Sequence, residues 1–156
     1  MASYTLQANV AAPVETVFDV LTDHRGYAKI TPLRGVEIER EGDPPPNGVG
    51  AIRVLKSIGP PIREEVVEYN RPTRFVYRLL SGAPVRDYVG TVELASHNGG
   101  TQIVYHVDST PTVPVGGAIV TAVGKAMVGQ LFKAIVKESE RRAGSSSPGG
   151  GTPAAA

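Results

Sequence analysis

The sequence of 156 residues contains no cysteine. Disulfides, thiol catalysis and thiolate metal sites are therefore excluded. No two of its three histidines have the spacing of metal ligands, and Gly48-Val49-Gly50 does not open a helix as a phosphate-binding loop would. We therefore expect neither a metal ion nor a cofactor.

The sequence also lacks an excess of either charge. Sixteen lysines and arginines stand against fifteen aspartates and glutamates, a formal net charge of +1. A partner held mainly by charge, such as a nucleic acid or an anionic membrane, is disfavoured. Several arginines on the predicted strands could suggest RNA binding, but acidic residues accompany them. We expect a small-molecule partner and no nucleic acid, and the sequence leaves a monomer or a homodimer open.

No apolar run is long enough to span a membrane. Residues 113–124 are uncharged and apolar, but Lys125 ends this run after twelve residues. A bilayer span needs about twenty residues, and runs of about 10–14 are more often buried core helices. The first residues carry no basic segment followed by an apolar one, so they do not read as a secretory signal. We expect a cytoplasmic protein without stable membrane insertion.

Hydrophobic periodicity predicts an α+β fold in one domain, residues 1–143. Alternating side chains predict about seven strands, at residues 4–10, 36–39, 51–56, 62–69, 74–80, 85–95 and 101–109. Two short helices are expected after the first strand, at 13–21 and 23–30, and one long helix at 114–142. Short connections make neighbouring strands antiparallel. Residues 144–156, rich in Gly, Ser, Pro and Ala, predict a flexible tail.

The long helix is the only predicted element able to cover the apolar face of the sheet. A single helix across a wide, curved sheet tends to leave space beneath it, so the order of elements predicts a cavity. Apolar residues at every fourth position form the predicted inward stripe of the helix: Ile119, Val123, Met127, Leu131 and Ile135.

Gly124 and Gly129 lie inside this helix, where each glycine costs about 1 kcal/mol against alanine. Close packing of the helix backbone is the simpler explanation for them. Room for a ligand, or a bend that opens a portal, is the alternative.

Alternation also proposes which strand side chains face the helix. The inward set is mostly apolar and includes three tyrosines, whose hydroxyls would orient a mainly apolar ligand. An ordinary core, with the tyrosines bonded to backbone carbonyls, is the alternative. With the helix positions included, the predicted ligand-binding residues are Ile52, Val54, Phe75, Tyr77, Leu79, Tyr88, Val92, Ile103, Tyr105, Ile119, Val123, Met127 and Leu131.

Catalysis would need a positioned acid or base, and the sequence offers only weak candidates. On the strands these are Tyr77, Tyr88 and Glu64. Burial would raise the pKa of an inward Glu64, but an ion pair with an arginine on the outer face of the sheet is the simpler interpretation. Of the three histidines, only His24 lies near the presumed mouth of the cavity.

Three segments carry a resemblance to a known family. They are Ala-Pro-Val-Glu-Thr-Val-Phe-Asp-Val-Leu-Thr-Asp at 12–23, Arg-Phe-Val-Tyr-Arg at 74–78 with its continuation through 81–88, and Gly-Thr at 100–101. Together with the order of elements, they resemble the polyketide cyclase/dehydrase family of the START/Bet v 1-like (SRPBCC) superfamily over about residues 3–142. Members usually carry a tryptophan before the proline that closes the second helix, whereas this chain has Ile30-Thr31-Pro32 and no tryptophan.

The resemblance implies a helix-grip fold, with the curved sheet wrapped around the long C-terminal helix and a hydrophobic cavity between them. Our leading hypothesis is therefore a protein that binds a lipid, a polyketide or a similar hydrophobic small molecule. One alternative is a polyketide cyclase/dehydratase-type enzyme that uses cavity Tyr or Glu side chains as acid or base. The other is a protein-interaction module that uses the outer face of the sheet or the tail.

Overall fold

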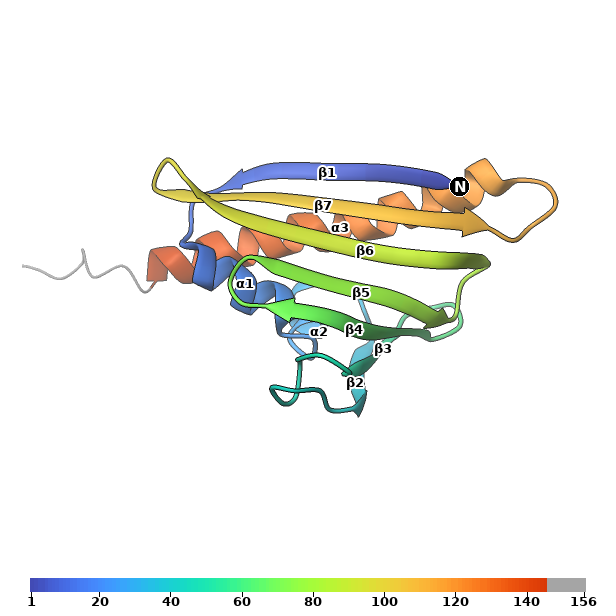
Figure 1. Cartoon of the computed structure of the whole chain (residues 1–156), viewed down its shortest axis with the longest axis horizontal. Coiled ribbons are helices and arrows are strands. Elements are labelled where there is room, and N and C mark those ends of the chain that lie inside the picture. Colours follow the sequence, from blue (N-terminus) through green and yellow to red (C-terminus); the bar gives the residue numbers. More distant parts are fainter. Residues whose placement is uncertain (146–156) are drawn as a thin grey trace, which may run out of the picture.

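The computed structural model of the chain describes residues 1–145 (Figure 1). Its strands are β1 (Ala2–Val10), β2 (Gly35–Arg40), β3 (Ile52–Lys56), β4 (Ile62–Asn70), β5 (Arg74–Ser81), β6 (Val85–His97) and β7 (Gly100–Pro111). Its helices are α1 (Val14–Thr22), α2 (Tyr27–Ile30) and α3 (Gly117–Ser145). The predicted elements are all present, and α2 is shorter than expected because residues 24–26 form a turn.

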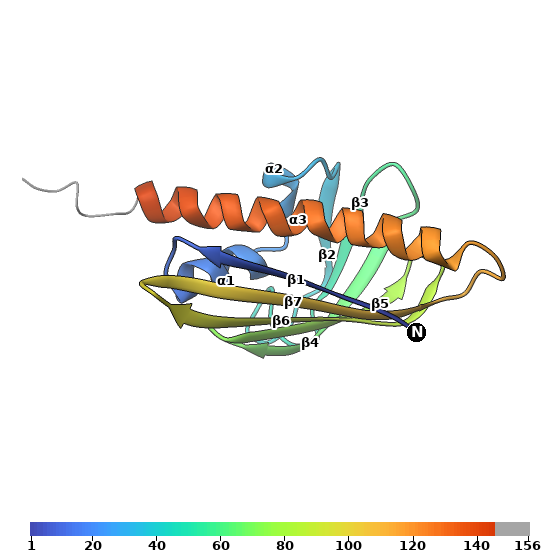
Figure 2. The same cartoon turned by 90° about the horizontal axis from the view of Figure 1, so that it is seen from above.

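The strands form one antiparallel sheet in the order β1-β7-β6-β5-β4-β3-β2. Consecutive strands from β2 to β7 pair directly, as their short connections require. The first two strands instead lie at opposite edges, so α1 and α2 carry the chain across the sheet. The sheet curves around α3, and this is the predicted helix-grip arrangement (Figure 2).

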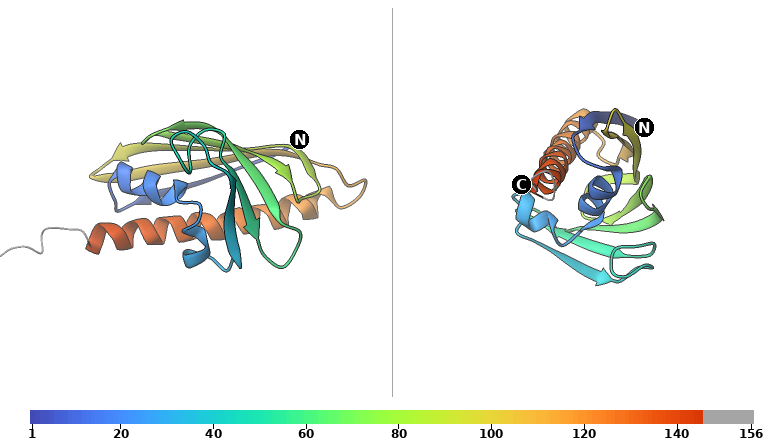
Figure 3. Two further views of the ribbon diagram at one scale, coloured as in Figure 1. Left: turned by 90° about the horizontal axis from the view of Figure 1, so that it is seen from below. Right: turned by 90° about the vertical axis from the view of Figure 1, so that its left-hand side faces the viewer.

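Helix α1 lies inside the curve of the sheet, between the strands and the C-terminal half of α3 (Figure 3). Its apolar face is almost wholly buried, with Val17 and Phe18 at 0% exposure and Leu21 at 1%. Phe75, Ile103 and Ile135, from β5, β7 and α3, belong to the same core cluster. The interior at this end of the molecule is therefore filled by three layers.

The predicted inward stripe of α3 is wrong over the first half of the helix. Ile119 and Val123 are 69% and 55% exposed, whereas Ile135 is fully buried. Positions four apart are rotated by about 40° on a helix of 3.6 residues per turn, so Ile119 and Ile135 point about 160° apart. Both cannot face the sheet.

The N-terminal half of α3 presents a different face to the interior, with Gly124 and Val128 turned inward and Ile119 and Val123 outward. By length and composition alone, α3 is apolar enough to cross a membrane, a weak indication because core helices of soluble proteins pass the same test. Here α3 lies along the sheet, with its C-terminal half packed on α1. The helix also continues to Ser145, two residues beyond the predicted domain, and the rest of the predicted tail lies outside the described residues.

Candidate ligand-binding cavity

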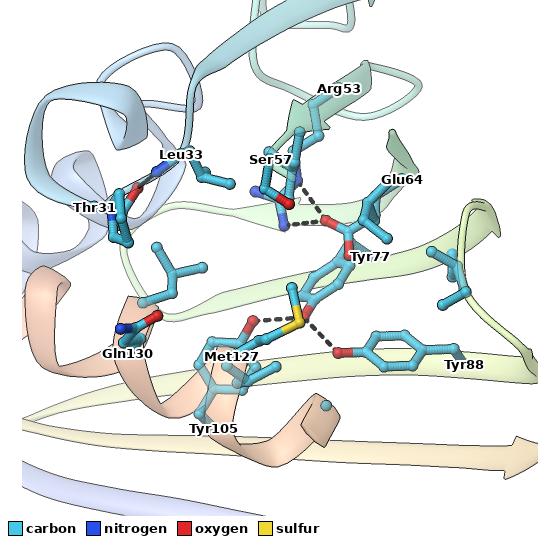
Figure 4. A pocket seen from close by; sticks show the side chains of 18 residues that line it. Thr31, Leu33, Arg53, Ser57, Glu64, Tyr77, Tyr88, Tyr105, Met127 and Gln130 are labelled. Carbon is cyan, nitrogen blue, oxygen red and sulfur yellow. Dashed lines mark hydrogen bonds and ion pairs between the residues drawn. The ribbon is translucent and has the colours of Figure 1, made fainter. Parts of the chain in front are cut away.

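A half-enclosed cavity of about 210 Å³ lies between the sheet and the first half of α3 (Figure 4). Strands β3 to β7 supply its inner wall, and the segment after α2 forms part of its rim. The helix contributes Gly124, Met127, Val128, Gln130 and Leu131. The strands contribute Arg53, Leu55, Ile62, Glu64, Tyr77, Leu79, Tyr88 and Tyr105, and the loops add Thr31, Pro32, Leu33, Ser57 and Ala83.

The predicted ligand-binding residues divide into four groups. The cavity is lined by Tyr77, Leu79, Tyr88, Tyr105, Met127 and Leu131. The solid core beside α1 contains Phe75, Val92 and Ile103. Ile119 and Val123 are mostly exposed to solvent. Ile52 and Val54 of β3 point to the outer face of the sheet.

Strand β3 has the opposite orientation to the one expected. Arg53 and Leu55 line the cavity, so Ile52 and Val54 between and beside them point outward. These two apolar side chains are nonetheless only 7% and 9% exposed. Their cross-strand neighbours on the outer face are Glu65 and Arg63, which belong to surface ion pairs. The long charged side chains cover the apolar ones and keep them from solvent. This explains why the hydropathy pattern of β3 predicted the wrong face of the strand to point inward.

Glu64 points into the cavity, where it forms a buried ion pair with Arg53. The two residues are direct cross-strand partners, and Arg53 is 1% and Glu64 6% exposed. The Nε of Arg53 donates to Glu64 Oε1 at 2.9 Å, and Nη2 lies 2.8 Å from the same oxygen. The expected ion pair with an arginine exists, but on the inner face of the sheet. Burial raises the pKa of Glu64, and the adjacent guanidinium opposes that rise.

Arg53 is held in place from the other side by His24 and Tyr27. Its Nη1 donates to His24 Nδ1 at 3.0 Å and to the Tyr27 hydroxyl at 3.2 Å. The guanidinium also lies 4.7 Å from the centre of the Tyr77 ring, within the range of a cation–π contact. All of these groups are buried, so the position of Arg53 at the cavity wall is fixed by several bonds at once.

His24, which was expected near the mouth of the cavity, is a neutral, buried link in this network and does not line the cavity. Arg53 can only donate to Nδ1, and the backbone carbonyl of Asn47 can only accept from Nε2, at 3.3 Å. These two partners require the neutral form with its proton on Nε2. Burial, and then the charge of Arg53, hold the pKa of His24 well below its usual value.

Three tyrosine hydroxyls meet on the wall opposite α3 (Figure 4). The Tyr77 hydroxyl lies 2.5 Å from that of Tyr105 and 3.4 Å from that of Tyr88. The ring of Tyr77 reaches this position across Gly90, its cross-strand partner, where a Cβ atom would lie 2.3 Å from the ring. Burial raises the pKa of all three tyrosines, so their hydroxyls stay protonated and act as hydrogen-bond donors.

The two helix glycines have no close neighbours, contrary to the simpler expectation. A Cβ atom built at Gly124 or at Gly129 would meet nothing within 4 Å. Gly124 faces the cavity, whereas Gly129 does not line it. Close packing of the backbone therefore explains neither residue, and Gly124 leaves the cavity wider than any larger residue would.

Sequence reasoning missed Arg53, His24 and Tyr27 as parts of one site. The available signal was the short connection between β3 and β4, which makes Arg53 and Glu64 neighbours whenever their strands pair in this register. Whether both side chains point into the cavity depends on which face of β3 points inward. Alternation of apolar residues alone predicted Ile52 and Val54 on the inner face and therefore placed Arg53 on the outer face.

Among the residues that the structure describes, no group of three or more His, Cys, Asp or Glu side chains could hold a metal ion. The charged residues of the cavity wall, Arg53 and Glu64, are already paired with each other. The arrangement offers an apolar space, three hydroxyl donors and one balanced ion pair. It is suited to hold a mainly apolar molecule and to orient a polar group on it.

Comparisons with known proteins agree with this architecture. Solved structures with similar folds include the Zhui aromatase/cyclase from a Streptomyces species, with a TM-score of 0.76 at 22% identity over 90% of this chain and 94% of that one. A START superfamily protein from Mycobacterium smegmatis has a TM-score of 0.75 at 16% identity, over 90% and 98% of the two chains. The major latex-like protein 151 of Panax ginseng has a TM-score of 0.70 at 14% identity, over 88% of this chain and 97% of that one.

At these identities the likeness establishes the fold alone, and the predicted helix-grip fold is confirmed. No curated protein matches this sequence. The sequence profile of one family, described as polyketide cyclase/dehydrase and lipid transport, matches residues 1–144. The match covers nearly all of the described residues, and the chain therefore belongs to this family.

Proposed function

We propose that the protein binds a hydrophobic small molecule, such as a lipid or a polyketide, in the cavity between the sheet and α3. The observation that carries this proposal is the half-enclosed space of about 210 Å³ beneath Gly124. Apolar side chains from both sides of this space, among them Leu79 and Leu131, would bury the ligand at about 25 cal/mol per Å² of apolar surface.

The decisive experiment fills this space from the helix. In Gly124→Leu, the new side chain enters the cavity without meeting other atoms near its Cβ. The new side chain occupies space that the ligand would otherwise fill. The lost ligand contacts are similar to those of one buried leucine, whose burial contributes about 1.5–3 kcal/mol, so the affinity for the ligand should fall about tenfold or more. Binding is measured with the neutral, environment-sensitive dye N-phenylnaphthylamine and by native mass spectrometry after gentle purification.

Gly129→Leu is the matched control. It makes the same exchange in the same helix, also with nothing near the new Cβ, but outside the cavity lining. Both variants should gain helical stability, since leucine is the better helix former. Dye binding that is equal in both variants would contradict the proposal.

A cyclase or dehydratase reaction is a second candidate function, supported by the polar groups on the cavity wall and by the fold shared with the Zhui aromatase/cyclase. The raised pKa values of Tyr77 and Tyr88 favour hydrogen-bond donation by their hydroxyls over proton transfer at neutral pH. The carboxylate of Glu64 is already bound in its ion pair with Arg53. Binding and polarising a ligand oxygen is therefore the simpler role for these groups. Turnover that is abolished in Glu64→Gln or Tyr77→Phe, with binding spared, would instead support an enzyme.

A further inference from the structure

The inner wall of the cavity has more hydroxyl protons than protein acceptors. Tyr77, Tyr88 and Tyr105 bring three O–H groups together through two contacts, and each contact uses one proton. One proton is left without an acceptor among the described residues. Tyr77 and Tyr105 are 2% and 1% exposed, whereas Tyr88 is half-buried, so bulk water reaches two of the three hydroxyls poorly and the cluster opens only toward the cavity. A buried donor without an acceptor is unfavourable, so the cluster is complete only when another molecule supplies an acceptor.

The tyrosine cluster has a further hydroxyl near its edge. The hydroxyl of Tyr4 on β1 is buried and has no hydrogen-bond partner among the described residues. Burial raises the pKa of Tyr4, and the neighbouring Tyr88 hydroxyl opposes that rise. Tyr4 does not line the cavity, and its hydroxyl brings one proton together with one acceptor oxygen. Tyr4 therefore leaves the excess of one hydroxyl proton in the cluster unchanged.

The charge of the cavity wall is already balanced. Of the residues that line the cavity, the charged ones are Arg53 and Glu64, and they form one ion pair. A further nitrogen of Arg53, Nη1, already donates to His24 and to Tyr27. An incoming carboxylate would find no unbalanced cation and would face the negative charge of Glu64. A buried anion without a partner is strongly disfavoured, whereas a neutral acceptor is not.

We propose that the ligand is uncharged and places a carbonyl oxygen against the hydroxyls of Tyr77, Tyr88 and Tyr105. The chemical class is a mainly apolar ketone, aldehyde or ester, rather than a carboxylic acid of the same length. This inference rests on the proposed function, because it concerns the same cavity. It specifies the polar end of the ligand, which the binding of an apolar molecule alone would leave open.

The test uses three competitors that share a chain length and differ at one end: methyl nonyl ketone, undecanoate and undecane. Each displaces N-phenylnaphthylamine from the full-length protein at about pH 8, where the carboxylate is ionised. The ketone should bind about tenfold or more tightly than the carboxylate. Undecane reports the purely apolar part of binding and serves as the internal reference.

Two variants separate the two parts of the argument. Replacing Tyr77, Tyr88 and Tyr105 together by Phe should weaken the ketone about three- to tenfold and leave undecane within about twofold. Glu64→Gln keeps an oxygen for Arg53 but removes the negative charge. It should therefore improve undecanoate about tenfold relative to the ketone. Glu65→Gln, on the outer face and paired with Arg40 and Arg78, should leave this ratio unchanged.

Circular dichroism first verifies that each variant is folded. If Glu64→Gln does not fold, the wild-type ratio and the triple Phe variant decide the question. A wild-type protein that binds dye and undecane, but prefers undecanoate to the ketone, would overturn the inference while leaving the proposed function intact. So would a triple Phe variant with unchanged ketone binding. Failure to take up dye or any competitor would overturn both.

Discussion

The interior of this protein differs at its two ends, although the same sheet and the same helix enclose both. At the closed end, α1 fills the space between them, with Val17 and Phe18 fully buried. Phe18 packs edge-on against Tyr69 at 5.1 Å between ring centres. At the open end, beneath Gly124, neither α1 nor α2 contributes to the lining, and a cavity of about 210 Å³ lies between the sheet and α3.

The cavity exists because α1 ends before it reaches the open end, and not because the side chains that line the cavity are of an unusual kind. Leu79 and Leu131 of the open end are of the same chemical kind as the core residues of the closed end. His24 and Tyr27 follow shortly after α1, and their bonds to Arg53 of β3 mark the border between the two ends. Fixed polar groups at that border give the open end its hydrogen-bonding character.

The largest predicted effect comes from truncating one side chain at each end. Phe18→Ala removes a fully buried ring from the closed end and should lower the free energy of unfolding by about 3–5 kcal/mol. Met127→Ala, at a 48% exposed residue of the cavity wall, should change it by less than about 1 kcal/mol. Urea denaturation followed by circular dichroism measures both. Equal losses would contradict the division into a closed and an open end.

An intermediate effect is expected where the open end is tightly packed after all. In Gly90→Ala the new methyl group would lie 2.3 Å from the Tyr77 ring, so the ring must move. We expect a loss of about 1–3 kcal/mol in stability and weaker dye binding. Gly35→Ala in β2 is the control, because a Cβ there meets nothing within 4 Å. A stable Gly90→Ala protein with normal binding would show that Tyr77 is not fixed by this contact.

Most of the fold could be predicted from the sequence because its signals are local. Strands such as β5 and β7 follow from two-residue alternation, and the turns between them from Gly, Pro and Asn. The hairpin connections then dictate antiparallel neighbours. The inward direction of Tyr77, Tyr88 and Tyr105 followed from the same alternation and places them together on the cavity wall.

The missing parts of the site depended on information that is not local. Arg53 looks like a surface residue in sequence, and only its partners Glu64 and His24 make its burial possible. On α3, hydropathy favoured Ile119 over Gly124, because a glycine that lines a cavity carries no apolar signal. The position of α1 inside the curve of the sheet arises from tertiary packing, so no pattern in residues 14–22 could place the cavity beside it.

The smallest effect, and the one that tests the border between the two ends, is a dependence of stability on pH. Burial, and then the charge of Arg53, lower the pKa of His24 in the folded protein, so below the unfolded value of about 6.5 the unfolded chain binds more protons. Stability from the neutral His24 is therefore present above about pH 6.5 and is lost as pH falls. The expected slope approaches 1.4 kcal/mol per pH unit. In His24→Gln this contribution to the slope should disappear, because an amide can still bond to Asn47 and Arg53 but does not titrate here. His97→Gln, at the exposed last residue of β6, should keep the wild-type slope. An unchanged slope in His24→Gln would mean that His24 does not link the closed end to the cavity wall as a neutral group.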